Sequence, residues 1–144
     1  MQKEIFRIID ANINRSREGL RVCEDIARFI LNSPTLTKEL KSIRHNISNI
    51  IKLSVANSKV LFESRDVEKD VGKNSQIISE MKRRDPIDIF YANIERSKES
   101  LRVLEEFFKL MDRKASAKFT ALRYRIYDIE KKSIKRVSSL RNLR

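Results

Sequence analysis

The sequence is poor in glycine and proline, with two of each in 144 residues, and it has one cysteine and no tryptophan. Two glycines cannot form the glycine-rich loops on which dinucleotide folds and P-loop enzymes bind phosphate. A β-rich domain needs a turn about every 8–12 residues, and so few glycines and prolines do not supply them. The scarcity of both residue types therefore predicts an all-α fold.

The other absences concern metals, disulfides and membranes. Cys23 alone cannot form an intramolecular disulfide, and one cysteine with one histidine, His45, cannot build a Cys/His zinc cluster. Apolar runs are short and the N-terminal residues lack the apolar stretch of a signal peptide. We therefore expect no contact with a membrane and a cytoplasmic location.

The net charge of +12 suggests a polyanionic partner, but its distribution weakens that interpretation. Half of the excess follows Glu130, where no acid occurs and the cations are Lys131, Lys132, Lys135, Arg136, Arg141 and Arg144. Such a block is typical of a solvated, fraying tail. Nucleic acid is therefore not the expected partner.

Apolar spacing predicts four long helices. Ser33-Pro34 and Asp85-Pro86 are helix-start signals, with the serine and the aspartate as caps. Residues 57–76 lose the helical period and predict a loop, and a short helix is expected around 77–83. The four helices are expected at about 3–31, 34–56, 86–111 and 112–137.

An internal repeat is the strongest signal in the sequence. Residues 11–25 match residues 92–106 at 10 of 15 positions, with an offset of 81. The economical interpretation is one domain over residues 1–144, in which two pseudo-symmetric helical hairpins form a four-helix bundle. The hairpins are residues 5–57 and 86–137, linked by 58–85.

The repeated residues are largely polar, whereas a repeat kept only for core packing would keep apolar residues. Small and amide residues follow one line inside the apolar face of each helix: Asn12, Ser16 and Gly19 in the first copy, Asn93, Ser97 and Ser100 in the second. Two explanations remain open. Small residues allow close helix contact, or the line forms the floor of a cavity for a small polar ligand.

Charged residues repeat as well. Glu18 with Arg21, and Glu99 with Arg102, have the spacing of solvated salt bridges or of paired substrate contacts. Arg15 and Arg96 border the apolar faces, where a guanidinium could reach a phosphate. Four arginines from four helices could therefore converge on one anion site: Arg15, Arg44, Arg96 and Arg123.

The segment from Arg65 to Gly72 contains two aspartates, Asp66 and Asp70, beside a glutamate and an arginine. Carboxylates on a loop suit Mg²⁺, which takes oxygen ligands and keeps several waters. The spacing matches no EF-hand loop, and a plain solvated loop is the alternative.

The chain resembles an all-helical family that occurs alone or fused to the N-terminus of thiamine-phosphate synthase. The resemblance covers about residues 5–132. It rests on the run from Asp10 to Asp25 and on four further blocks in the same order: 40–45, 65–72, 92–106 and 122–127. It departs at Cys23, where leucine is more usual, and at Ser16 and Ser97, where alanine is common.

The resemblance implies a kinase that converts 4-amino-5-hydroxymethyl-2-methylpyrimidine monophosphate and ATP to the diphosphate, the pyrimidine precursor of thiamine. As hypotheses, Arg65, Asp66 and Asp70 are catalytic, with Arg65 closing over the reacting group, and Glu18, Asp66 and Asp70 hold Mg²⁺. The expected substrate- and phosphate-binding residues are Asn12, Arg15, Glu18, Arg21, Arg44, Asn93, Arg96, Glu99, Arg102 and Arg123.

Partners and alternatives complete these expectations. Thiamine-phosphate synthase is an expected partner, and a homo-oligomer, specifically a dimer, is expected as well. The main alternative function is a non-catalytic module that binds ligand or promotes oligomerisation for that synthase.

Overall fold

The computed structural model describes residues 1–75 and 81–142. Within these ranges the regular structure is helical and contains no strand, so the predicted all-α class is confirmed. The long helices are α1 (Gln2–Asp25), α2 (Pro34–Ser54), α4 (Pro86–Phe108) and α5 (Arg113–Asn142), and the short helix is α3 (Lys59–Glu63).

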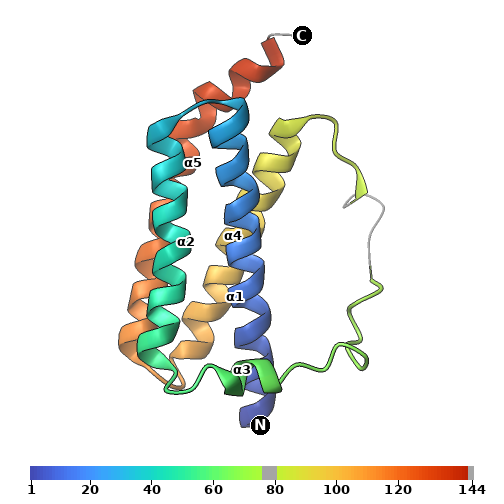
Figure 1. Ribbon diagram of the computed structural model, residues 1–144, viewed down its shortest axis with the longest axis vertical. Helices are drawn as coiled ribbons and strands as arrows, with labels where there is room; N and C mark the ends of the chain where they lie inside the picture. Colours follow the sequence, from blue (N-terminus) through green and yellow to red (C-terminus); the bar gives the residue numbers. More distant parts are fainter. Residues whose placement is uncertain (76–80, 143–144) are drawn as a thin grey trace.

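The long helices form two antiparallel hairpins, α1 with α2 and α4 with α5 (Figure 1). Each long helix contacts two others, so that α1 packs on α2 and α4 while α5 also packs on α2 and α4. Helices α1 and α4 run in opposite directions and make the most extensive contact between elements. The two copies of the repeated sequence therefore face each other.

The helix starts follow the sequence signals. The Ser33 hydroxyl accepts a hydrogen bond from the Leu36 amide, and Asp85 accepts one from the Asp88 amide. These side chains satisfy backbone N–H groups that have no partner within the helix. Between the first two helices, Asn32 adopts a positive φ of 49°, a conformation that asparagine tolerates better than most residues.

Several predicted boundaries were wrong. The first helix changes to a π-helix over Ile26–Ile30, and the second and third end earlier than expected, at Ser54 and Phe108. Helix α3 lies inside the segment predicted as a loop; a five-residue helix is too short for the helical period to stand out. A short helix was expected around 77–83, and most of that range, residues 77–80, lies outside the described residues.

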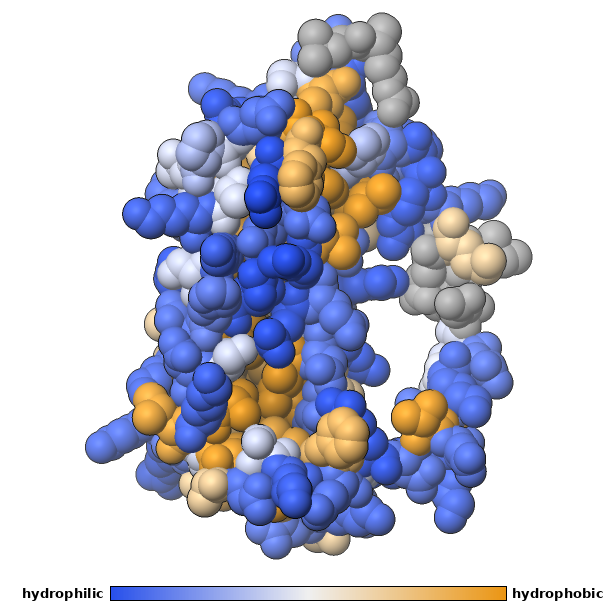
Figure 2. All heavy atoms as spheres, in the orientation of Figure 1, coloured by the Kyte–Doolittle hydropathy of each residue, from blue (hydrophilic) through white to orange (hydrophobic). Residues whose placement is uncertain are grey.

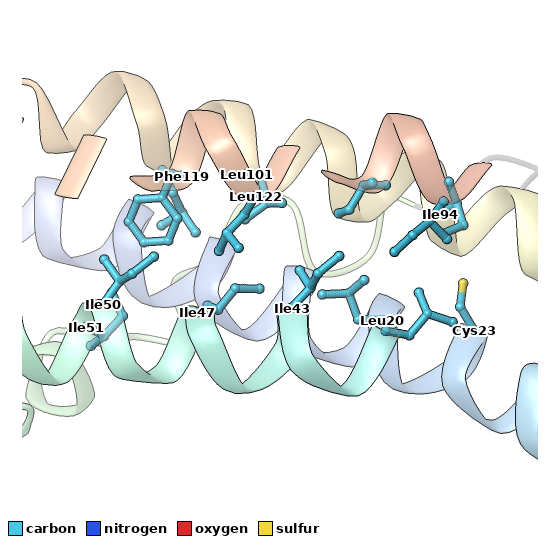
Figure 3. Packing of buried hydrophobic residues seen from close by; sticks show 14 of the residues in the cluster. Leu20, Cys23, Ile43, Ile47, Ile50, Ile51, Ile94, Leu101, Phe119 and Leu122 are labelled. Atoms are coloured by element: carbon cyan, nitrogen blue, oxygen red, sulfur yellow. The ribbon is translucent and has the colours of Figure 1, made fainter. Parts of the chain in front are cut away.

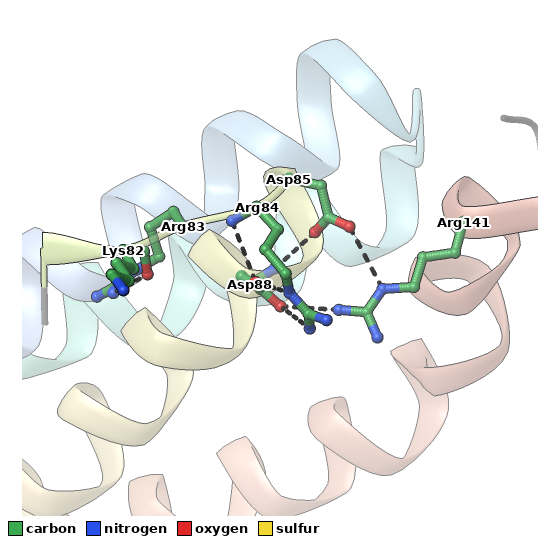
Figure 4. Close-up of polar contacts among 6 residues, drawn as sticks. All are labelled: Lys82, Arg83, Arg84, Asp85, Asp88 and Arg141. Carbon is green, nitrogen blue, oxygen red and sulfur yellow. Dashed lines mark hydrogen bonds and ion pairs between the residues drawn. The ribbon is translucent and has the colours of Figure 1, made fainter. Parts of the chain in front are cut away.

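The C-terminal basic segment is not the fraying tail that its charge suggested. Helix α5 continues to Asn142, and Val137 is fully buried. Near its end, Arg141 Nη2 donates to Asp88 Oδ1 over 2.7 Å, and Arg141 Nε lies 3.4 Å from Asp85 Oδ2 (Figure 4). The negative charges of the two aspartates also interact favourably with the positive N-terminal end of the α4 dipole. Acids at the start of α4 thus hold the end of α5.

The core is the apolar interior shared by the four long helices. Side chains such as Leu20, Ile47, Leu101 and Phe119 point into one space from α1, α2, α4 and α5 respectively (Figure 3). Burial of such side chains is the main force that stabilises the assembly of helices. Within the described ranges, no helix has the length and apolar character needed to cross a membrane.

Candidate functional site

Small side chains let α1 and α4 approach closely at the repeat. A Cβ atom added to Gly19 would lie 2.6 Å from Ser97 Oγ and 2.9 Å from the Asn93 carbonyl oxygen. Ser97 Oγ also donates to the carbonyl oxygen of Ser16, its repeat equivalent, over 3.4 Å. The close-packing explanation therefore holds for the serines and the glycine. Because equivalent residues meet here, the pseudo-twofold axis that relates the two hairpins passes through this contact.

A pocket of about 440 Å³ spans the same contact, and we call it the twofold pocket. Asn12, Arg15, Glu18 and Gly19 line it from α1. Their repeat equivalents, Asn93, Arg96, Glu99 and Ser100, line it from α4 together with Val103. A pocket therefore lies along the same line of residues, and both copies of the repeat contribute to it.

The asparagines of the twofold pocket have matching hydrogen bonds. Asn12 Nδ2 donates to the Ile8 carbonyl oxygen and Asn93 Nδ2 to the Ile89 carbonyl oxygen, each over 2.8 Å. Only nitrogen can donate to a carbonyl, so these bonds fix the orientation of each amide. The strong group left for a ligand is the acceptor Oδ1, with the second amide N–H beside it.

Arg15 and Arg96 differ from the other arginines singled out in the sequence. Both are exposed and line the twofold pocket, and within the described residues neither has an ion-pair or hydrogen-bond partner for its side chain. A guanidinium carries up to five donors in a planar fork, which suits bidentate binding of phosphate oxygens. The two repeat-related arginines are therefore available to bind an anion between α1 and α4.

The structure does not bring Arg44 and Arg123 to this pocket. Arg44 Nε donates to Glu24 Oε2 over 2.9 Å, and Arg123 Nε donates to Glu105 Oε2 over 3.1 Å. Each pair joins the two helices of one hairpin, and its side chains are at least largely buried. The predicted convergence of four arginines was wrong, because two of them bind carboxylates inside the hairpins.

Arg21 and Arg102 are also placed elsewhere. Their guanidinium groups lie 3.5 Å from Glu24 and 3.7 Å from Glu105 respectively, rather than beside Glu18 and Glu99. Each buried glutamate thus has two arginine neighbours. Burial alone would raise the pKa of Glu105, but hydrogen bonds from Thr120 and Arg123 and the nearby positive charges hold it below its usual value.

A second, larger pocket of about 770 Å³ adjoins the first, and we call it the loop pocket. It shares Asn12, Arg15, Glu18 and Val103 with the twofold pocket. The loop after α3 supplies Arg65, Asp66, Val67 and Asp70, and the N-terminal half of α1 supplies Glu4, Arg7, Ile8, Asp10, Ala11 and Asn14, with Val103 from α4. In the space-filling view, an opening separates this loop from the helical body (Figure 2).

Arg65 attaches the loop to α1. Its Nε and Nη2 donate to Asp10 Oδ2 and Oδ1 over 2.5 and 2.9 Å, and its guanidinium carbon lies 4.7 Å from the centre of the Phe62 ring. The hydrogen bonds to Asp10 raise the pKa of Arg65. Such a two-bond pair fixes orientation as well as distance. Arg65 is therefore an anchor of the loop in this structure, which is not the contact expected of a residue lying over a reacting group.

The carboxylates proposed for Mg²⁺ line one pocket but are not clustered. Over residues 1–75 and 81–142, no group of three or more His, Cys, Asp or Glu side chains is placed to hold a metal. Asp66 Oδ1 accepts from the Lys69 amide, and Asp70 Oδ1 accepts from the Gly72 amide. Mg²⁺ commonly takes one or two carboxylates and completes its shell with phosphates and water. These carboxylates therefore suit an ion that is held partly by phosphates and water, and not one that is held by protein ligands alone.

Sequence reasoning missed Asp10, which directly precedes the repeated region. It is 7% exposed, and its carboxylate holds Arg65 from across the pocket. The signal was a departure from the repeat, because the equivalent residue on α4 is Tyr91. A carboxylate beside the buried Ile9, without a counterpart in the other copy, indicated a contact that only one half makes.

Comparison with known proteins assigns this arrangement to a family. The sequence profile described as the ThiD2 family matches residues 7–132, which include both copies of the repeat and the loop. The chain belongs to the ThiD2 family. Apart from Glu4, the lining residues of both pockets lie inside the matched range.

Curated relatives of this ThiD2 chain include proteins named thiamine-phosphate synthase. The protein from Rhodopirellula baltica is 40% identical over 125 residues, 87% of this chain and 33% of that protein. The protein from Synechocystis sp. is 40% identical over 126 residues, 88% of this chain and 35% of that protein. The chain thus spans about a third of the length of these relatives. No solved structure matches the ThiD2 chain.

Proposed function

We propose that this ThiD2 chain is a kinase that converts 4-amino-5-hydroxymethyl-2-methylpyrimidine monophosphate to the diphosphate, with ATP as the phosphoryl donor. The observation that carries the proposal is the pair Arg15 and Arg96, which are repeat-related, line one pocket and have no carboxylate partner within the described residues. The similarity to thiamine-phosphate synthases supports the pyrimidine as substrate, because the diphosphate is the form that enters thiamine synthesis.

The reaction requires little from the protein beyond positioning and charge. An oxygen of the substrate phosphate attacks the γ-phosphorus of ATP, the bond from that phosphorus to the β–γ bridging oxygen breaks, and ADP leaves with its electron pair. A phosphate monoester has a second pKa of about 6, so at pH 7 this oxygen is already largely deprotonated. A general base is therefore not needed, and His45, exposed on α2, has no required role.

The pocket residues have chemistry that suits these tasks. Arg15 and Arg96 would bind phosphate oxygens and stabilise the charge that is shared among them during transfer. The Oδ1 atoms of Asn12 and Asn93 would accept from the amino group of the pyrimidine. One or two of the carboxylates of Glu18, Asp66 and Asp70 would hold Mg²⁺, which would neutralise charge on the phosphates.

A steady-state assay that couples ADP release to a spectroscopic signal tests the proposal, with ATP, Mg²⁺ and the pyrimidine monophosphate. We expect ADP release only when the pyrimidine is present. The double variant Arg15→Ala/Arg96→Ala should lose it, whereas Arg17→Ala, an exposed α1 arginine outside both pockets, should retain it. Binding of the pyrimidine without ADP release would favour a non-catalytic module that serves thiamine-phosphate synthase.

A further inference from the structure

The two halves of the twofold pocket are equivalent in sequence but not in surroundings. Position 10 of α1 is an aspartate, and its repeat equivalent on α4 is Tyr91. The Asp10 carboxylate accepts two hydrogen bonds from Arg65. The Tyr91 ring instead packs edge-on against Phe90, with ring centres 5.9 Å apart. A neutral phenol cannot form a two-bond ion pair with a guanidinium, so only the α1 half can anchor the loop in this way.

The consequence is an unequal distribution of carboxylates. Asp66 and Asp70 line the loop pocket together with Arg15 and Glu18 of the α1 copy. The corresponding α4 residues, Arg96 and Glu99, line only the twofold pocket and not the loop pocket. Helix α4 reaches the loop pocket only through Val103. The two loop carboxylates, which suit a metal–nucleotide complex, therefore share a pocket with Arg15 and not with Arg96.

The sizes of the two pockets point the same way. The loop pocket, at about 770 Å³, is larger than the twofold pocket, at about 440 Å³. ATP is the larger substrate and carries the greater negative charge. The two pockets adjoin at Asn12, Arg15, Glu18 and Val103, so a ligand in one pocket would lie next to a ligand in the other.

We propose that the α1 half of the site holds ATP, that the α4 half holds the pyrimidine monophosphate, and that the Asp10–Arg65 pair sets this order by fixing the acidic loop over α1. Arg15 then binds donor phosphates and Arg96 binds the phosphate of the acceptor. Asp10 is a positioning residue, since it acts through Arg65. This inference rests on the proposed kinase function and adds to it the assignment of each substrate to one copy of the repeat.

The repeat offers a matched pair of variants for the test. Arg15→Ala and Arg96→Ala remove equivalent side chains, and calorimetry measures the binding of Mg·ATP alone and of the pyrimidine monophosphate alone. We expect Arg15→Ala to weaken Mg·ATP at least about tenfold, as for loss of a charge-assisted hydrogen bond, with the pyrimidine affinity within about threefold of wild type. Arg96→Ala should give the opposite result. Equal effects on both ligands, or the reverse pattern, would overturn the assignment.

The positioning role of Asp10 has its own test. Asp10→Asn should raise the KM for ATP and leave the KM for the pyrimidine unchanged, and Asp10→Glu should restore part of the loss. Arg65→Gln, at the more exposed end of the pair, serves the same purpose if Asp10→Asn does not fold. Equal changes in both KM values would contradict the role.

Failure of the inference can be told apart from failure of the proposed function. A wild-type protein that binds both ligands but releases no ADP would contradict the kinase activity, and the binding measurements would still decide the order of the ligands. A wild-type protein that binds neither ligand would overturn both proposals. An active wild type in which the two alanine variants behave alike would overturn only the order.

Discussion

Ser97 Oγ donates to the Ser16 carbonyl oxygen over 3.4 Å, and these residues occupy equivalent positions of the internal repeat. Equivalent residues can meet in this way only near the axis that relates the two hairpins. The contact therefore locates the pseudo-twofold axis between α1 and α4, next to the pocket that both copies line. It also means that many substitutions in one copy have a natural control in the other.

Gly19→Ala should destabilise the fold. The new methyl group would meet Ser97 Oγ at 2.6 Å and the Asn93 carbonyl oxygen at 2.9 Å, and the second of these is backbone that cannot rotate away. Overpacking costs about 1–3 kcal/mol, and alanine regains up to about 1 kcal/mol through helix propensity. We expect a net loss, measured as a lower urea midpoint with an unchanged m-value. Ser100→Ala, at the equivalent position, should have a much smaller effect, and equal midpoints for the two variants would contradict the close contact.

Glu105→Gln should be among the most destabilising substitutions in the chain. Glu105 and Arg123 are 8% and 7% exposed in their side chains, so the variant leaves a buried guanidinium without its counter-charge. Removal of one partner from a buried pair costs about 3–5 kcal/mol. The neighbouring Glu106→Gln removes a pair with Lys109 that is about half exposed, and an exposed pair contributes about 0–1 kcal/mol. Urea unfolding at pH 7 measures both, and similar losses would contradict the buried role of Glu105.

The same pair predicts the direction of a pH effect. Because the pKa of Glu105 is lowered in the folded protein, its contribution to stability is complete above the unfolded value of about 4.5. The contribution is lost as the pH falls through the lower, folded pKa. The difference in unfolding free energy between wild type and Glu105→Gln should therefore be constant near neutral pH and shrink below about pH 4.5. A difference that grows on acidification would be inconsistent with this assignment.

Arg65→Ala should leave the protein folded and lower its turnover. The Arg65 side chain is 40% exposed, so its loss removes little packing, although Asp10 loses its partner at a cost of about 1–3 kcal/mol. A released loop would misplace Asp66 and Asp70, and such misplacement can cost about 10²-fold, so we expect a loss of more than about tenfold in kcat/KM. Arg28→Ala removes another arginine that lies over an aromatic ring, Phe29, outside both pockets, and is the control. Unchanged kinetics in Arg65→Ala would remove the loop from the mechanism.

Substitution of exposed cations on the last turns of α5 tests whether the basic charge has a role in the reaction. Lys131, Lys135 and Arg136 are exposed, whereas Val137 is buried, so glutamine at the three cations is a milder change than truncation of the helix. Surface substitutions of this kind change stability by about ±0.5 kcal/mol each. We expect ADP release to be unchanged in the triple variant. A large loss of activity would show that these charges attract a ligand.

The fold was largely predictable because its signals are local. The scarcity of glycine and proline, the helical period and the caps at Ser33 and Asp85 each depend on residues close in sequence. The repeat added the pairing of the two hairpins. The π-helix over Ile26–Ile30 and the short helix α3 were not predicted, because they depend on packing against the rest of the molecule rather than on a periodic pattern.

The site was predicted in part. Spacing placed Asn12 inside the apolar face of one helix and Arg15 at its border. The repeat placed Asn93 and Arg96 in the same way on another helix, so the meeting of these residues in one pocket could be anticipated. Arg44 and Arg123 were expected at the same anion site, yet they bind Glu24 and Glu105 inside the hairpins. Sequence alone does not distinguish an arginine that binds a carboxylate of its own chain from one that binds a ligand, since both lie at the border of an apolar face.

The most direct test of the central claim is the rate of ADP release from Mg·ATP by the wild-type protein, with and without the pyrimidine monophosphate. We expect release that depends on the pyrimidine and saturates with it. Release should be lost in Arg15→Ala/Arg96→Ala, while circular dichroism shows that this variant remains folded. ADP release at the background rate from well-folded wild-type protein in the presence of both substrates would contradict this claim.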